Sequence, residues 1–339
     1  MKGDSINFIS AGAGSGKTTR LTQILMEKLA GKEAAPNGII ATTFTNKAAA
    51  ELKERVRAML LQQDRQDLAV SIFEAQIGTV NNVCGGLLRR FAFEMGLSIE
   101  QQVLDECAAK EHLARAIDSV VSADGLAEVT DLAQRFGNVK RQNGEPAWQD
   151  DIKAVIDHAR YNNIDPREFA EFARKNADEL LALFPQPADD RLEERVRSEI
   201  SRTQPIIEKG YSIKPQKNTS AYLDLLRKFD RSLQNGRFTW NEWLNMAKAK
   251  PAKALHDATV RLDAVCRQVV MHPRLQWDIR RYLEIIFSIA EKALVIYQEQ
   301  KRLSGFVDFA DQEAMLLEGL DNSSVRKRLQ EKLDLLLVD

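Results

Sequence analysis

The sequence predicts an α/β protein in which a parallel sheet carries helices on both faces and is interrupted by a large, all-helical insertion. Through the first hundred residues, short β-prone runs alternate with helical periodicity, which is typical of a parallel sheet with crossover helices. From about residue 105 the β-prone runs vanish and helical spacing dominates. A compact apolar run, Leu335–Val338, then resumes the first pattern. We therefore expect one α/β domain that is interrupted by roughly 200 helical residues.

Composition excludes several classes of protein. The chain has 339 residues, of which 44% are hydrophobic and 29% are charged, so neither a disordered nor a fibrous protein fits. Its three cysteines and four histidines are scattered, without the spacing of a disulfide framework or a zinc site. No run is apolar enough to span a membrane and no secretory leader is visible, which predicts a cytoplasmic protein. Because 48 basic residues balance 49 acidic ones, any nucleic-acid site must be local.

Periodicity predicts the individual elements. The runs expected to form strands are Ile6–Ser10, Ile39–Thr43, Gln76–Val80 and Leu335–Val338. Helical spacing covers residues 18–29, a segment with Asn46 as its N-cap, residues 84–95 and residues 274–302. Turn-rich breaks divide the helical middle at residues 137–146, 184–190, 208–220 and 250–251.

The most specific motif is a glycine-rich loop between the first expected strand and the first expected helix. It reads Ala11-Gly12-Ala13-Gly14-Ser15-Gly16-Lys17-Thr18, followed by Thr19, which is the spacing and context of a phosphate-binding loop. Its glycines let backbone N–H groups converge on a phosphate, and the next helix directs its partial positive end at the same anion. We expect Lys17 to reach the β- and γ-phosphates and Thr18 to offer its hydroxyl to Mg²⁺. The alternative is a glycine-rich turn without a ligand.

A second polar cluster follows the second expected strand. Thr43-Phe44-Thr45-Asn46-Lys47 lies where that strand enters its helix, at the carboxyl edge of a parallel sheet and beside the phosphate loop. An aromatic ring at this edge can stack on an unpaired base, and Thr, Asn and Lys can bind backbone phosphates. The alternative is a capped surface helix with a buried phenylalanine.

With these residues the chain resembles a known family. The segments AGAGSGKTTRL, TTFTNKAAAELKERV, IGTVNNVCGGLLRRF and LLLVD are similar to the successive N-terminal motifs of UvrD/Rep-type superfamily 1 DNA helicases, in the same order and spacing. The opening SAGAGSGKT also resembles the group that includes the RecB and AddA helicase–nuclease subunits. The resemblance covers both ends of the chain. The helical middle matches by its position, where the family inserts an accessory subdomain.

The resemblance implies a fold, an activity and roles for single residues. Residues 1–104 and 300–339 would form a RecA-like ATP-binding domain, and residues 105–299 the helical accessory subdomain. The activity would be ATP-dependent, 3′ to 5′ movement along single-stranded DNA or at a single/double-strand junction, in repair or recombination, with ATP and Mg²⁺ as cofactors. Lys17 and Thr18 are carried over as triphosphate and Mg²⁺ contacts and Asp339 as a second Mg²⁺ contact. Residues 43–47, with Thr79 and Asn81, are carried over as DNA contacts.

Departures from the family pattern bear on the mechanism. The motif that usually reads GTIHSFC is GTVNNVC here, so Asn81 can still hydrogen-bond DNA, whereas Val83 offers no stacking surface. No glutamine precedes the phosphate loop, so the usual adenine-reading residue is not visible. The sequence ends at Asp339, before the glutamate and the second RecA-like domain of the family, and such groups are commonly worth about 10² to 10⁵ each in rate. We therefore expect a fragment that binds ATP and hydrolyses it poorly, and whose partner is the missing C-terminal domain.

Residues 201–260 combine positive charge with aromatic side chains. They contain eleven Lys plus Arg and five Asp plus Glu. The aromatic residues among them are Tyr211, Tyr222, Phe229, Phe238, Trp240 and Trp243. This composition suits nucleic-acid binding. The alternative is that the rings form a helix-packing core and the lysines a solvated surface.

Two other functions remain open at this level. One is a nucleotide-gated module that engages DNA or a partner without turnover. The other is a different phosphate-loop enzyme, such as a kinase, with the helices as a lid over its substrate. The segment TFTNKAAAELKERV argues against the kinase.

Overall fold

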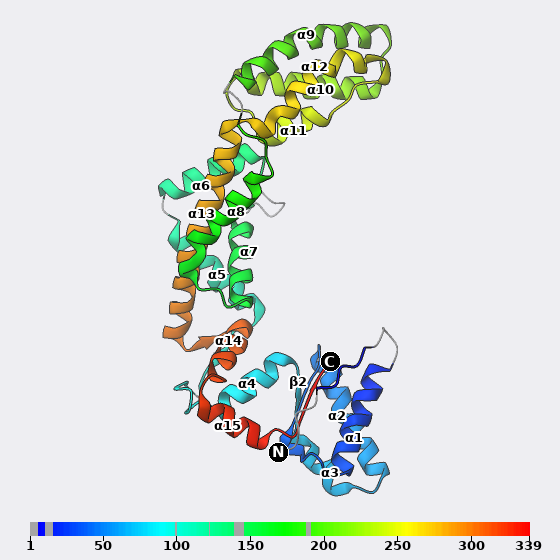
Figure 1. Cartoon of the computed structure of the whole chain (residues 1–339), viewed down its shortest axis with the longest axis vertical. Coiled ribbons are helices and arrows are strands. Elements are labelled where there is room, and N and C mark those ends of the chain that lie inside the picture. The colour runs from blue at the N-terminus through cyan, green and yellow to red at the C-terminus, as the bar shows by residue number, and fades with distance from the viewer. Residues whose placement is uncertain (1–5, 11–15, 99, 122, 139–145, 188–190) are drawn as a thin grey trace. The chain divides into compact units, whose positions relative to one another are not determined.

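The computed structural model describes residues 6–10, 16–98, 100–121, 123–138, 146–187 and 191–339 (Figure 1). The chain divides into two compact units. The sheet unit comprises Met1–Ala109 and Lys301–Asp339, and the helical unit comprises Lys110–Gln300. The described residues are mostly helical, and their strands form a small parallel sheet and a two-residue parallel pair in the sheet unit.

The sheet is built around β1 (Ile39–Thr42), which pairs in parallel with β2 (Gln76–Gly78) on one side and with β5 (Leu335–Val338) on the other. All four residues of β1 are buried, as expected for the central strand of a parallel sheet. Three of the four predicted strands are thus confirmed. β2 ends earlier than predicted because Val80 already belongs to the next helix.

The prediction of a strand at Ile6–Ser10 is wrong. These residues form no strand, and the side chains of Ile6 and Phe8 are 98% and 92% exposed. A β-prone run becomes a strand only when its backbone finds a ladder partner and its side chains find a surface to pack on. Neither condition is met here, so local composition misled the assignment.

Helices cover both faces of the sheet. α1 (Lys17–Ala30), α2 (Asn46–Gln62) and α3 (Gln66–Ser71) share one apolar core with Ile39 and Ala41. The core of the other face contains Ile40 together with side chains from α4 (Val80–Arg90), α14 (Phe309–Gly319) and α15 (Ser323–Lys332). Successive side chains of a strand point to opposite faces, so β1 contributes to both cores.

Two glycines allow close packing in the sheet unit. A Cβ atom at Gly38 would come within 2.4 Å of the Asp334 carboxylate, and the Asp334 N–H donates to the Gly38 carbonyl at 2.8 Å. A Cβ atom at Gly85 would come within 2.9 Å of the Gln312 side-chain nitrogen, so this glycine lets α14 approach α4. The remaining strands, β3 (Gln102–Val103) and β4 (Phe306–Val307), form the parallel pair.

The helical unit packs around two apolar cores. α6 (Ala123–Phe136), α7 (Trp148–Tyr161) and α13 (Pro273–Ser304) contribute to one core with α5 (Glu106–Val120) and the start of α8 (Phe169–Ala182). The second core contains side chains from α9 (Leu192–Ile213), α10 (Lys217–Gln234), α11 (Trp240–Lys248) and α12 (His256–Cys266), together with Leu275 of α13. The described residues also form 3₁₀ turns at Pro36–Gly38, Ile72–Glu74, Pro166–Glu168, Lys253–Leu255 and Arg267–Met271.

The predicted break at residues 208–220 is wrong in its extent, because α9 continues to Ile213 and α10 begins at Lys217. The long helix predicted over residues 274–302 is confirmed as α13. Nowhere in the described ranges is a helix both long and apolar enough to cross a membrane.

The aromatic residues of the basic segment belong to the second core. The buried ones are Tyr222, Phe229, Phe238, Trp240 and Trp243, and Tyr211 packs against the same core from a partly exposed position. Buried rings cannot stack on DNA bases. The helix-packing interpretation is therefore confirmed for these rings, and the hypothesis of an aromatic nucleic-acid surface is wrong.

A buried carboxylate joins the two cores of the helical unit. Asp278 of α13 is fully buried and accepts hydrogen bonds from Trp240 Nε1 at 2.8 Å and from Arg135 Nη1 at 2.6 Å. Trp240 belongs to the second core, while α6 and α13 contribute to the first. The carboxylate is paired with a cation and hydrogen-bonded to an indole, and these contacts offset the free-energy cost of burying its charge.

We expect Asp278→Ala to lower the free energy of unfolding of the helical unit by about 3 kcal/mol, because it leaves Arg135 and a buried indole N–H without this acceptor. All four tryptophans lie between residues 110 and 300, so tryptophan fluorescence during urea denaturation reports on this unit alone. Asp131 carries the other carboxylate beside Arg135, and its side chain is more than half exposed. Asp131→Ala should therefore lower the free energy of unfolding by less than about 1 kcal/mol. Equal losses of unfolding free energy in the two variants would contradict a structural role for the buried Asp278 carboxylate.

Candidate functional site

Three strands of the sheet end at the same edge and bring distant parts of the chain together. The register sets Thr42 of β1 opposite Gly78 of β2 and Val338 of β5. Beyond these residues, the Thr43 N–H donates to the Gly78 carbonyl at 2.9 Å, and the Asp339 N–H donates to the Thr42 carbonyl at 3.1 Å. We call residues 43–47, residues 79–82 and Asp339 the strand-end edge.

The loop between β1 and α2, together with the first turn of that helix, exposes an aromatic ring and a cation. Phe44 is 94% exposed and Lys47 is exposed. Thr45 is the N-cap of α2, because its backbone is extended and its side-chain oxygen accepts from the Ala48 N–H at 3.1 Å. The prediction of Asn46 as the N-cap is therefore wrong by one residue, which leaves the Asn46 side chain available for another contact. The ring of Phe44 is not buried, so the alternative of a buried phenylalanine is also wrong.

The loop between β2 and α4 has the same construction. Thr79 is the N-cap of α4, and its hydroxyl accepts from the Asn82 N–H at 3.3 Å. Asn82 Nδ2 then donates to Asn46 Oδ1 at 2.8 Å, which joins this loop to the start of α2. The Oδ1 atom of Asn81 is buried and has no hydrogen-bond donor in the part of the chain that the structure describes. Val83 is buried in the core, so the position of the usual aromatic residue serves packing here.

The described end of the phosphate loop leads into α1. Gly16 has a φ of +83°, a left-handed conformation that favours glycine, and precedes Lys17 as the N-cap of the helix. No side chain among the described residues caps this helix, so its first N–H groups remain for an anion. Lys17 and Thr19 are exposed and Thr18 is partly exposed. Residues Ala11, Gly12, Ala13, Gly14 and Ser15 lie outside the described residues.

The two predicted Mg²⁺ contacts suit a hard cation. Thr18 offers a hydroxyl and Asp339 an exposed carboxylate, and Mg²⁺ prefers oxygen ligands of this kind. Within the described ranges, no group of three or more His, Cys, Asp and Glu side chains could hold a metal by itself. Mg²⁺ usually keeps several waters and binds through one or two protein ligands and substrate phosphates, so a sparse protein site fits this ion.

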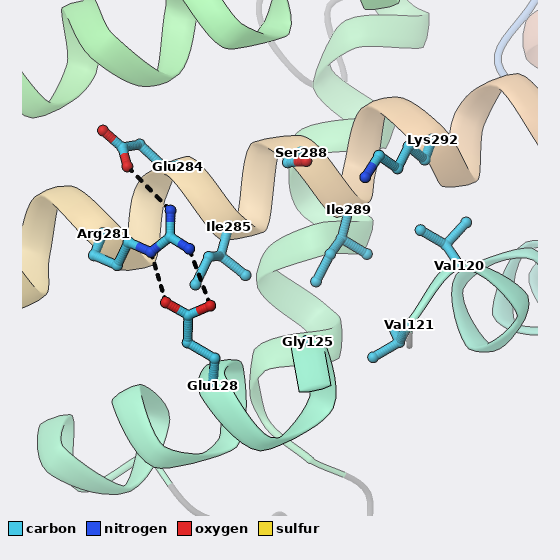
Figure 2. Close-up of a pocket in the computed structure, with 10 residues that line it drawn as sticks. All are labelled: Val120, Val121, Gly125, Glu128, Arg281, Glu284, Ile285, Ser288, Ile289 and Lys292. Atoms are coloured by element: carbon cyan, nitrogen blue, oxygen red, sulfur yellow. Dashed lines mark hydrogen bonds and ion pairs between the residues drawn. The ribbon is translucent and has the colours of Figure 1, made fainter. Parts of the chain in front are cut away.

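A cavity of about 230 Å³ lies in the helical unit between α5, α6 and α13 (Figure 2). The cavity is lined by two cationic side chains, Arg281 and Lys292. Arg281 is already paired, because it donates to both carboxylate oxygens of Glu128, at 2.6 and 3.0 Å, and lies 3.5 Å from Glu284. The Arg281 guanidinium also holds the pKa of the Glu128 carboxyl below its ordinary value. None of the residues predicted to carry chemistry lines this cavity, and we assign it no part in nucleotide binding.

The sheet unit also contains a buried ion pair that was not predicted from the sequence. Lys301, which is 3% exposed, donates to Asp308 at 2.8 Å and to Asp311 at 2.5 Å. Asp308 and Asp311 also form the capping box that starts α14. The signal was present in the sequence as two aspartates three residues apart before an apolar helix. Their arrangement with Lys301 fixes the point where the chain returns to the sheet unit.

A family model described as the UvrD/REP helicase N-terminal domain matches residues 2–339. The chain is 31% identical over 177 residues to the ATP-dependent DNA helicase PcrA of Bacillus subtilis, a match that covers 52% of this chain and 20% of that protein. It is 23% identical over 364 aligned positions to an ATP-dependent helicase/nuclease subunit of Geobacillus thermodenitrificans, covering 90% of this chain and 28% of that protein. It is 37% identical over 99 residues to DNA helicase II of Haemophilus influenzae, covering 29% and 13% of the two chains. The chain thus spans between 13% and 28% of the length of these relatives.

We expect Lys301→Met to destabilise the sheet unit by about 3 to 5 kcal/mol, because it leaves two carboxylates without their buried cation. The loss can be measured by chemical denaturation followed by circular dichroism, with Lys327→Met, an exposed lysine of the same unit, as the control. A loss at Lys301 no larger than that at Lys327 would mean that the pair stabilises nothing.

Proposed function

The chain belongs to the UvrD/REP helicase N-terminal domain family, and we propose that it forms the ATP-binding and single-stranded-DNA-binding motor part of an ATP-dependent DNA helicase or translocase. The observation that carries the proposal is the strand-end edge, where the segments after β1, β2 and β5 meet. In parallel α/β sheets, ligands bind at the carboxyl ends of the strands.

We assign the nucleotide to the phosphate loop. The start of α1, which no described side chain caps, and the exposed Lys17 provide two independent attractions for a triphosphate, a helix terminus and a point charge. Residues 11–19 would bind the nucleotide, with Lys17 in contact with its β- and γ-phosphates. Thr18 and Asp339 would hold Mg²⁺. Bound ATP supplies the energy for movement. The sheet unit would be the RecA-like domain, assigned from the sequence to residues 1–104 and 300–339, and the helical unit the accessory subdomain at residues 105–299.

We assign single-stranded DNA, or the single-stranded side of a junction, to the remainder of the strand-end edge. Phe44 presents almost its whole ring to solvent, where it can stack on a base, since every base offers a face for stacking. Lys47 and the amino ends of α2 and α4 would bind backbone phosphates. Thr43, Thr45 and Thr79 would act mainly by shaping these loops, since the hydroxyl of Thr43 donates to the Thr45 carbonyl and the other two cap helices. The 3′ to 5′ polarity is inferred from the family resemblance.

Hydrolysis by these residues alone should be slow. The ten residues of the strand-end edge contain one carboxylate, that of Asp339, which is assigned to Mg²⁺. Phosphoryl transfer to water also needs a group that positions or activates the water and further cations that neutralise the developing charge. The same observation favours a second candidate function, a nucleotide-gated module that binds DNA or a partner without turnover.

We expect Lys17→Ala to weaken Mg-ATP binding by roughly 10- to 100-fold in isothermal titration calorimetry, because it removes a charge-assisted contact to the phosphates. EDTA should weaken binding by the wild-type chain. Lys28→Ala, on the same helix but paired with Glu33, is the matched control and should bind as the wild type does. Binding that is indifferent to Lys17 would overturn the nucleotide assignment. A parallel phosphate-release assay separates the two functions, since DNA-stimulated turnover of about 1 s⁻¹ or more would contradict slow hydrolysis.

Replacing Phe44 by alanine should weaken binding of a fluorescein-labelled oligothymidine by roughly 5- to 100-fold in fluorescence anisotropy, the range expected when one base loses its stacking partner. Phe93→Ala is the matched control, because that ring is 83% exposed on the same unit but lies beyond the opposite end of α4. Equal affinities of the wild type and the Phe44 variant would remove the ring from the DNA site.

A further inference from the structure

Asn82 lies within the strand-end edge, but its side chain has been given no role of its own among the proposed DNA contacts. Its side-chain amide donates to Asn46 Oδ1 at 2.8 Å, between residues that are 36 positions apart in the sequence. The two asparagines lie in the first turns of α4 and α2. This bond connects the loop that carries Phe44 and Lys47 to the loop that carries Thr79 and Asn81.

The local structure is built to admit this contact. A Cβ atom at Gly78 would lie 3.1 Å from Asn82 Cβ, which is tighter than ordinary van der Waals contact. The absence of a side chain at Gly78 thus leaves room for Asn82 next to the end of β2. The hydroxyl of Thr79 also accepts from the Asn82 backbone N–H, so the residue is held at its backbone as well as at its side chain.

The contact sets the geometry of two helix amino ends. Thr45 and Thr79 each satisfy the N–H group of the third helical residue, at Ala48 and Asn82. The first two N–H groups of each helix have no partner within the helix and can bind phosphate oxygens. Successive phosphates of a single strand are joined through a sugar, which limits the distance between them, so two such helix ends bind one strand best when their own separation is held.

We propose that Asn82 is a positioning residue for single-stranded DNA, which acts through Asn46 by locking the start of α4 to the start of α2. The inference rests on the proposed function, because it concerns the same DNA-binding edge. Asn82 itself contacts no phosphate or base in this proposal. One amide N–H of its side chain donates to Asn46, and this bond fixes the loop that presents Phe44.

A double-mutant cycle tests the proposal on the whole chain, with anisotropy of a labelled oligothymidine as the readout. Asn82→Ala should weaken binding by roughly three- to tenfold, the range expected for one hydrogen bond. Asn46→Ala should weaken it at least as much, because Asn46 belongs to the DNA-binding loop. The Asn46→Ala/Asn82→Ala variant should bind no more weakly than Asn46→Ala, because Asn82 then has nothing to position. Asn82→Gln, which retains an amide donor, should restore the affinity to within about twofold of the wild type.

A matched control separates positioning from general stability. Asn245 donates to Asn241 at 3.2 Å on the exposed side of α11, so Asn245→Ala removes a bond of the same kind in the helical unit. This variant should leave DNA affinity unchanged, and all variants should retain the melting temperature of the wild type within a few degrees.

Three results would overturn the inference. Unchanged DNA affinity of Asn82→Ala, while Phe44→Ala weakens binding, would refute the positioning role and leave the proposed function intact. Additive losses in the double variant would mean that Asn82 contacts DNA itself. Failure of the wild-type chain to bind the oligonucleotide would refute the proposed DNA site, and the positioning role with it.

Discussion

The parallel pairing of β1 with β2 and β5 is the interaction on which the sheet unit depends. Its backbone hydrogen bonds pair three strands that run in the same direction, so the segments that follow these strands all leave the sheet at one edge. Residues 43–47, 79–82 and 339 become neighbours through this constraint alone, although they are widely separated in the sequence. An antiparallel β5 would carry Asp339 to the opposite edge, away from both loops. The location of the site therefore follows from strand direction, and the side chains on these segments determine its chemistry.

The sheet unit accommodates a large helical insertion between β2 and β5. Closing a flexible loop as long as the helical unit, Lys110–Gln300, would cost entropy, although this cost grows only slowly with loop length. The intervening residues 110–300 are not a flexible loop, since they bury two apolar cores of their own and join them through Asp278. At the return to the sheet unit, Lys301 is buried against Asp308 and Asp311. Further along, Gly38 and Asp334 interlock beside the start of β5. The return of the chain to β1 is thus fixed by specific contacts.

Much of the fold could be predicted from the sequence because its strands and helices carry strong periodic signals. β1, β2, β5 and the 32-residue α13 lie where hydrophobic spacing predicts them. The failures share a cause, which is that local composition does not identify a tertiary partner. Ile6–Ser10 has the composition of a strand and no ladder to join. α9 continues past Glu208 and contains Pro205 within it, because Val196, Ile200 and Ile207 on its apolar face remain buried in the second core.

The candidate site was predictable in its residue types and unpredictable in their contacts. A polar cluster after a buried strand indicates a binding edge, and the exposed ring of Phe44 agrees with that expectation. The cap of α2 was less predictable, because a shift of one residue in the start of the helix changes the residue that caps it. Thr45 takes this role in place of Asn46.

The bond between Asn46 and Asn82 requires more, namely the register that sets Thr42 opposite Gly78 and a glycine that leaves space for Asn82. The two helices begin at the ends of neighbouring strands, so their first turns come within hydrogen-bond distance only when that register is correct. A polar contact of this kind is a consequence of the sheet, and it becomes visible only after the sheet has been assembled. Binding sites at the edges of parallel sheets can thus be located from sequence, whereas the contacts that hold their loops in position must be read from the three-dimensional structure.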